Sequence, residues 1–158
     1  MPSTVFGLPL HPLIVHATTV LVPLAVVTVV LAVLVPRFRR WAGPLPALLS
    51  LVALVLTPLS TESGENLERS VAETALLERH AELGDQLIPM TVALFVLAAA
   101  FWWLGRRQPQ DRARTLVAVV GGLAIVAAAA TGVQVARIGH SGAAAAWSDV
   151  GSASGSAE

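Results

Sequence analysis

Four long apolar segments constrain this chain more than any other feature of its sequence. They cover residues 13–35, 45–59, 86–104 and 115–136. A helix needs about 20 mostly apolar residues to cross the hydrocarbon core of a bilayer, with a range of roughly 17 to 25. Three segments reach that length, and the second reaches it when extended to residues 42–60, as a tilted helix allows. The sequence therefore predicts an all-α integral membrane protein, a bundle of four transmembrane helices.

The composition agrees with a membrane protein. Of the 158 residues, 55% are hydrophobic and only 13% are charged, and the mean hydropathy is +0.73. Soluble domains carry about 25% charged residues. The net charge is zero, so nothing favours nucleic-acid binding, and the lack of cysteine excludes disulfides and thiolate metal sites. The first apolar segment has no basic start and is followed by PRFRR, so we expect a retained helix and not a cleaved signal peptide.

The basic residues are divided unevenly between the two ends of the expected bundle. All ten are arginines, and the two short connections hold seven of them: Arg37, Arg39, Arg40, Arg106, Arg107, Arg112 and Arg114. Positively charged short loops remain on the cytoplasmic side of a membrane. We therefore expect both short connections inside the cell, and both termini and the long central connection outside.

The central connection is long and acidic. Its sequence ENLERSVAETALLERHAELGD places Leu67 and Val71 at helical spacing between acidic residues. It predicts an extra outer amphipathic helix over about residues 65–83, lying over the bundle mouth, with Ser63 near its start and Gly84 as a break. The acidic side chains are most simply the solvated face of that helix.

The C-terminal end of the chain changes in character after Trp147. Residues 148–158 are rich in glycine and serine, and such a composition predicts a disordered tail. Residues 1–147 then form a single transmembrane domain, as expected for a chain of this length.

The four histidines all fall on the side predicted to be outside. A histidine at the mouth of a membrane helix is costly enough to require a reason. His11 and His16 are five residues apart, so their side chains point about 140° apart on a helix and cannot both face one small ion. His16 is deeper, so we expect it to be buried in the bundle mouth, with His80 as its favoured partner and His140 as the next. His11 would lie at the rim, and Arg137 would face the same cavity.

Three stretches of the chain carry a resemblance to a known family. They are FGLPLHPLIVH (residues 6–16), SGENLERSVAETALLERHAELGD (residues 63–85) and RIGHSGAAAAW (residues 137–147). Together they resemble the bacterial membrane family catalogued as domain of unknown function 2231, over nearly the whole chain from Phe6 to Trp147. Many members continue the histidine motif as HFP, whereas Ala17 and Thr18 follow His16 here. The resemblance implies a small four-helix protein of the bacterial cytoplasmic (inner) membrane. The Rieske-type domain attached to some members implies a redox setting.

The first functional hypothesis is haem b binding with a role in electron transfer. Helical bundles build cofactor sites from side chains on facing helices, and haem iron accepts histidine as an axial ligand. We expect His16 and His80 as axial ligands, with His140 and His11 as further candidates. Arg137 would pair with a propionate. A redox partner protein would then dock on the outer face.

The second hypothesis is a haem-free membrane subunit. Imidazoles suit zinc and copper, and a site formed by His16 and His80 with His11 and His140 would provide enough ligands. Alternatively, the histidines only brace the outer face. No nucleophile–base arrangement, phosphate-binding glycine loop or HExxH motif occurs, so we expect a binding or electron-transfer protein without catalytic residues.

Overall fold

Helices make up nearly all of the described chain. The computed structural model describes residues 4–5, 8–69, 74–106 and 111–153. Its long helices are α1 (Leu10–Leu34), α3 (Leu45–Glu68), α4 (Ala75–Gly105) and α5 (Asp111–Ala153), each long and apolar enough to cross a membrane. A short helix α2 (Pro36–Ala42) follows α1, and β1 (Thr4–Val5) pairs antiparallel with β2 (Leu8–Pro9) ahead of it. The prediction of an all-α membrane bundle with four spanning helices is confirmed.

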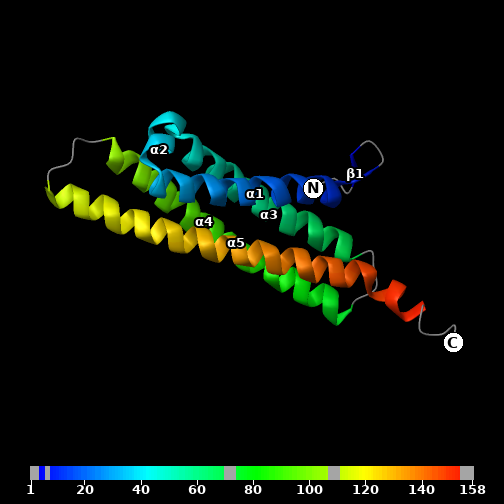
Figure 1. The fold of residues 1–158 in the computed structure, drawn as a ribbon. Helices are drawn as coiled ribbons and strands as arrows, with labels where there is room; N and C mark the ends of the chain where they lie inside the picture. Colours follow the sequence, from blue (N-terminus) through cyan, green and yellow to red (C-terminus); the bar gives the residue numbers. More distant parts are fainter. Residues whose placement is uncertain (1–3, 6–7, 70–73, 107–110, 154–158) are drawn as a thin grey trace.

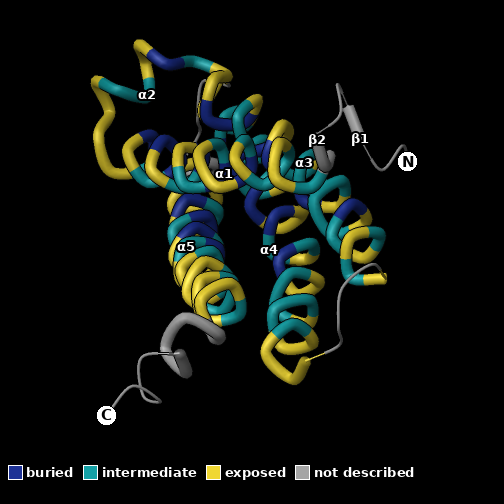
Figure 2. Tube along the Cα trace, turned by 90° about the vertical axis from the view of Figure 1, so that its right-hand side faces the viewer, coloured by how far each residue is buried: buried dark blue, intermediate teal, exposed yellow. Residues whose placement is uncertain are grey.

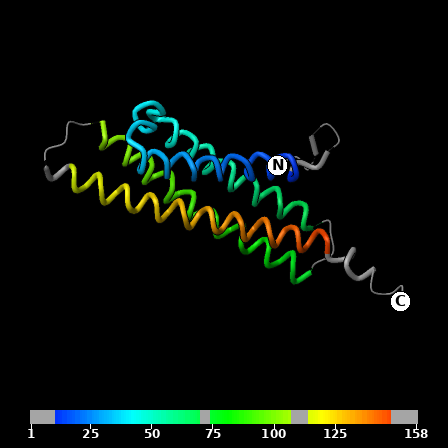
Figure 3. The backbone as a smooth tube through the Cα atoms, viewed as in Figure 1, coloured from blue at the N-terminus to red at the C-terminus, as the bar shows by residue number. Residues whose placement is uncertain are grey.

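The four long helices pack as a ring of antiparallel neighbours. Helix α1 contacts α3 and α5, and α4 contacts the same two helices, so α1 and α4 lie diagonally across the bundle (Figures 1 and 2). Helix α1 begins and α5 ends at the same end of the bundle (Figure 3). We name this the histidine end, after His11 and His80. The opposite end, which carries Arg39 and Arg114, is the arginine end.

Many large apolar side chains point outward, and most of the buried positions hold small or hydroxyl side chains. Val20, Val126 and Val133 are each at least 60% exposed. Buried examples are Ala25, Ala53, Ala124, Ala128, Ser50, Thr57, Thr91 and Thr131. Small residues allow helix backbones to approach closely in a membrane, where lipid is as apolar as leucine. This arrangement suits a bundle surrounded by lipid.

The interior hydroxyls are bonded to the backbone of their own helices. Thr57 Oγ1 donates to the Ala53 carbonyl at 2.8 Å, and Thr131 Oγ1 donates to the Ala127 carbonyl at 2.8 Å. Among the described residues, no buried side-chain nitrogen or oxygen lacks a hydrogen-bond partner. A hydroxyl that donates in this way still has oxygen lone pairs for a second contact, which matters at the histidine end.

The separate outer helix predicted over residues 65–83 does not form. Helix α3 continues to Glu68, and α4 begins at Ala75 and runs straight through Gly84. Residues 70–73 lie outside the described part. Most of the rest of the segment is helical, as its periodicity predicts. These residues extend two transmembrane helices, because the sequence has no signal that ends either helix earlier.

Two further features show that the predicted outer helix is divided between α3 and α4: the cap of α4 and the position of Ser63. Thr74 has an extended backbone conformation, and its Oγ1 accepts a hydrogen bond from the Leu77 N–H at 3.3 Å. A threonine at this position satisfies one of the free N–H groups in the first helical turn. Ser63, predicted to start the outer helix, lies within α3 and is buried.

Two more segments differ from the sequence-based expectation. The PRFRR connection forms α2, which has Pro36 in its first turn and ends at Gly43, whose φ of 55° favours glycine. The tail was expected to be disordered from residue 148, whereas α5 continues to Ala153. Residues 154–158 lie outside the described part.

Candidate functional site

Two histidines at the histidine end are each held by a serine on the neighbouring helix. His11 Nδ1, at the start of α1, lies 3.1 Å from Ser63 Oγ on α3. His80 Nδ1, near the start of α4, lies 3.0 Å from Ser141 Oγ on α5. Both imidazoles are half-buried. The hairpin of α1 and α3 and the hairpin of α4 and α5 therefore present a histidine in the same way.

The hydrogen bonds of the serines indicate the position of the histidine protons. Ser63 Oγ donates to the Ser60 carbonyl at 2.9 Å, and Ser141 Oγ donates to the Ile138 carbonyl at 3.0 Å. A hydroxyl has one proton, and a carbonyl oxygen only accepts. With that proton directed to the carbonyl, each hydroxyl oxygen accepts from the histidine, and on this basis we assign the ring proton to Nδ1. The neutral imidazole then has an unprotonated Nε2, the form in which histidine binds a metal.

A glycine follows each of these serines and contacts the histidine ring. A Cβ atom at Gly64 would lie 3.1 Å from Cε1 of His11, and a Cβ atom at Gly142 would lie 3.0 Å from Cε1 of His80. These distances are shorter than ordinary carbon contacts, so a side chain at either position would push the ring away. The Ser-Gly dipeptide provides both the acceptor and the space that the imidazole needs.

The two histidine–serine pairs lie at the same end of the bundle. His11 and His80 stand on the diagonal helices α1 and α4. The serines that orient them stand on the other diagonal, α3 and α5. All four spanning helices thus contribute a residue to the two pairs at this end of the bundle.

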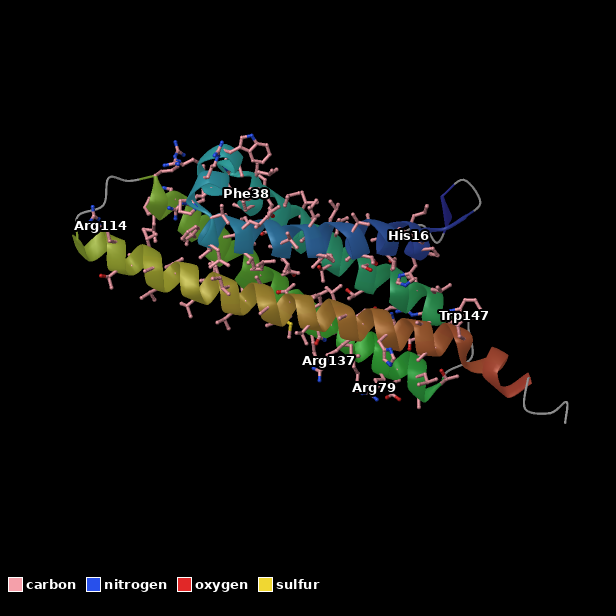
Figure 4. All side chains as sticks on the ribbon, viewed as in Figure 1. His16, Phe38, Arg79, Arg114, Arg137 and Trp147 are labelled. Carbon is pink, nitrogen blue, oxygen red and sulfur yellow. The ribbon has the colours of Figure 1, made fainter. Side chains whose placement is uncertain are left out.

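The prediction that His16 is buried in the bundle mouth is wrong. His16 is exposed, and its Nδ1 donates to the Pro12 carbonyl of its own helix at 2.6 Å. Figure 4 shows it on α1 near the histidine end. The 140° separation from His11 was correct, but α1 turns His11 and not His16 toward α3. His11 therefore takes the place expected for His16 beside His80.

His140 and Arg137 also lie away from the expected cavity. Both residues are exposed on α5. Figure 4 shows Arg137 at the edge of the bundle, on the side away from α1. Of the five predicted site residues, only His11 and His80 are half-buried and contact a serine of a neighbouring spanning helix.

A buried polar layer lies below the two histidines. Gln134 is only 2% exposed, and its Nε2 donates to the Leu83 carbonyl at 2.8 Å and contacts Gln86 Oε1 at 3.4 Å. It stands two helical turns below Ser141 on the same face of α5. Thr18 and Thr57 are buried at similar depth on α1 and α3, each bonded to its own helix. The floor of the site is therefore polar and fully hydrogen-bonded.

The number of possible ligands limits what the site could hold. In the described ranges, no group of three or more histidine, aspartate or glutamate side chains is placed to hold a metal ion. Two imidazoles on opposite helices are too few for the four-ligand shell of a structural zinc site. They are enough for the two axial positions of a haem iron, whose other four ligands come from the macrocycle.

Sequence analysis missed the serines and glycines of the site. Ser63, Gly64, Ser141 and Gly142 were not among the candidate residues. The available signal was the repeated Ser-Gly dipeptide, which occurs near the histidine end of both α3 and α5. Recognising it required treating the chain as two similar helical hairpins.

Comparison with known proteins identifies a family but no individual relative. No curated protein and no solved structure matches the chain. The model of the family described as "Predicted membrane protein (DUF2231)" matches residues 7–154. The match includes both histidine–serine pairs and all four spanning helices. The chain therefore belongs to the DUF2231 family of predicted membrane proteins.

Proposed function

We propose that the protein binds haem b through His11 and His80 and transfers electrons at the outer side of the membrane. The observation that carries this proposal is the matched pair of imidazoles on diagonal helices, each with Nδ1 within hydrogen-bond distance of a serine hydroxyl that also bonds to a backbone carbonyl. If these side chains only held the helix ends together, the same histidine–serine contact would not be needed on both hairpins.

The residues around the imidazoles suit axial ligands. Metal-binding histidines almost always donate their other ring N–H to a fixed acceptor, which sets the tautomer and the orientation of the ring. Ser63 and Ser141 act as those acceptors, and Gly64 and Gly142 allow the rings to lie against the helix backbone.

This arrangement favours electron transfer over catalysis. A haem with histidine at both axial positions exchanges single electrons and has no open position for a substrate. In that role His11 and His80 hold the iron, the two serines hold the rings, and the four helices limit the access of water. A redox partner protein would dock at the histidine end.

The distribution of arginine gives the orientation that we propose. Seven arginines lie in the two short connections at the arginine end, which the positive-inside rule assigns to the cytoplasm. The histidine end and both termini then face the outer side of a bacterial cytoplasmic membrane. The haem would lie near that surface, within reach of an extracytoplasmic partner.

The test is the absorption spectrum of the protein purified from cells supplied with a haem precursor. We expect a Soret band that shifts on reduction and is lost in His11→Ala and His80→Ala. His16→Ala and His140→Ala are matched controls, because both histidines are exposed, and they should keep the band. A wild-type protein that takes up no haem, or unchanged spectra in both site variants, would reject the proposal. Zinc or copper retained by the wild type and lost in the same two variants would favour the ion site instead.

A further inference from the structure

The arginine end of the bundle has a pocket of its own. Its volume is about 360 Å³, within the range of small-ligand sites. Arg39 of α2 and Arg114 of α5 line it together with the apolar side chains of Val33, Phe101 and Val117. The pocket is far from the histidines, and the proposed haem site makes no use of it.

The two arginines give this pocket a positive charge. Arg39 is half-buried, with its Cζ atom 5.4 Å from the centroid of the Phe101 ring, so the ring holds the guanidinium beside the pocket. Of the ten acidic residues, only Asp111 occurs in the sequence around the two short connections, beside seven arginines. The pocket therefore favours an anion.

The remaining walls are mainly apolar. Phe101 and Val33 pack directly against Gly121, where a Cβ atom would lie 3.0 Å from the phenylalanine and 3.2 Å from the valine. Trp41 of α2 and Trp103 of α4 are exposed near this end, and tryptophan is enriched at the level of lipid headgroups. A ligand here would have its charged group beside the arginines and an apolar part along the helices.

The geometry points to a binding site for one anionic phospholipid, with its phosphate between Arg39 and Arg114 and an acyl chain along Val33 and Val117. Guanidinium groups bind phosphate oxygens through paired, charge-assisted hydrogen bonds. Basic pockets between membrane helices on the cytoplasmic side accept anionic headgroups. Figure 4 shows Arg114 at the start of α5, at the same end of the bundle as Phe38 of α2.

Native mass spectrometry with two lipids of identical acyl chains tests this site. The probes are phosphatidylglycerol, which is anionic, and phosphatidylcholine, which has no net charge. We expect the wild type to retain one phosphatidylglycerol at least about tenfold more strongly than phosphatidylcholine, a ratio of the size that one or two charge-assisted hydrogen bonds produce. Arg39→Gln and Arg114→Gln should each remove most of that preference.

Two further variants distinguish lipid binding in the pocket from a nonspecific attraction of anionic lipid to the arginines. Arg40→Gln removes the same charge from the same short helix, but Arg40 is exposed and does not line the pocket, so the preference should remain. Ala118→Leu fills the pocket from an exposed position without changing the charge, so it should weaken retention. Equal retention of the two lipids, equal losses in Arg39→Gln and Arg40→Gln, or displacement of the lipid by millimolar inorganic phosphate would each overturn the inference.

Discussion

His80 and Ser141, 61 positions apart in the chain, meet at the end of the bundle with Nδ1 and Oγ 3.0 Å apart. His11 and Ser63 repeat the contact at 3.1 Å on the opposite hairpin. In both pairs the hydroxyl also donates to a carbonyl three residues earlier in its own helix. The serine is thus a fixed acceptor, and the histidine cannot rotate without losing its partner.

Removing this acceptor should weaken haem binding without abolishing it. We expect Ser141→Ala to lower haem affinity by about 10–100-fold, as found for groups that orient metal-binding histidines, and Ser63→Ala to act similarly. Haem titration followed by absorption measures the change. Thr19→Ala is the control, because that exposed hydroxyl bonds only to the Val15 carbonyl of its own helix. Equal affinities in Ser141→Ala and Thr19→Ala would show that the serine does not orient the ligand.

The glycine beside each histidine gives a prediction that does not depend on haem. In Gly142→Ala the new Cβ would lie 3.0 Å from the His80 ring, and such overpacking costs about 1–3 kcal/mol in the free energy of unfolding. Gly139→Ala, one turn earlier on α5, meets nothing within 4 Å. It should raise stability by up to about 1 kcal/mol, because alanine favours a helix. Detergent unfolding followed by circular dichroism compares the two, and Gly142→Ala must prove the less stable.

The sequence was sufficient to predict four spanning helices and to place all four histidines at one end. Those features depend on segment length and on counting the connections, which local sequence contains. The choice between His11 and His16 was different. Their angular separation could be calculated, but which of them faces α3 depends on how α1 is rotated in the bundle. His16 was predicted because it lies further along the helix. In the structure, it is His11 that packs against Ser63 and Gly64.

The prediction of a separate outer amphipathic helix was wrong for a related reason. Helical periodicity shows that a segment is helical, but it does not show whether that helix is separate from its neighbours. Residues 65–83 are divided between α3 and α4 because both helices continue past the membrane boundary. The extension of α3 places Ser63 beside His11, and the extension of α4 places His80 beside Ser141. The site exists only because the predicted break was absent.

The orientation of the bundle can be tested with single cysteines, since the chain has none of its own. Arg40→Cys and Glu78→Cys place exposed thiols at opposite ends of the bundle. In intact cells, an impermeant maleimide should label Glu78→Cys, whereas Arg40→Cys should react only after the membrane is opened. Labelling of both variants in intact cells, or only of Arg40→Cys, would contradict the outer placement of the histidine end.

Substitutions of Gln134 can distinguish the contribution of its hydrogen bond to stability from the contribution of its packing. The side chain is 2% exposed and donates to the Leu83 carbonyl at 2.8 Å. Gln134→Leu keeps most of the volume and loses the hydrogen bond, which in membrane bundles is worth about 0.6 kcal/mol on average and at most about 1.7. Gln134→Ala also leaves a cavity, so we expect it to cost about 2–5 kcal/mol in the free energy of unfolding.

The control for these two variants is Val126→Ala, at a position that is 66% exposed on the same helix. It should change stability by less than about 0.5 kcal/mol, because it leaves no buried cavity. The expected order of destabilisation is Gln134→Ala, then Gln134→Leu, then Val126→Ala. If Gln134→Leu proved as damaging as Gln134→Ala, the bond to Leu83 would outweigh packing. The polar layer would then hold α4 and α5 together directly below His80 and Ser141.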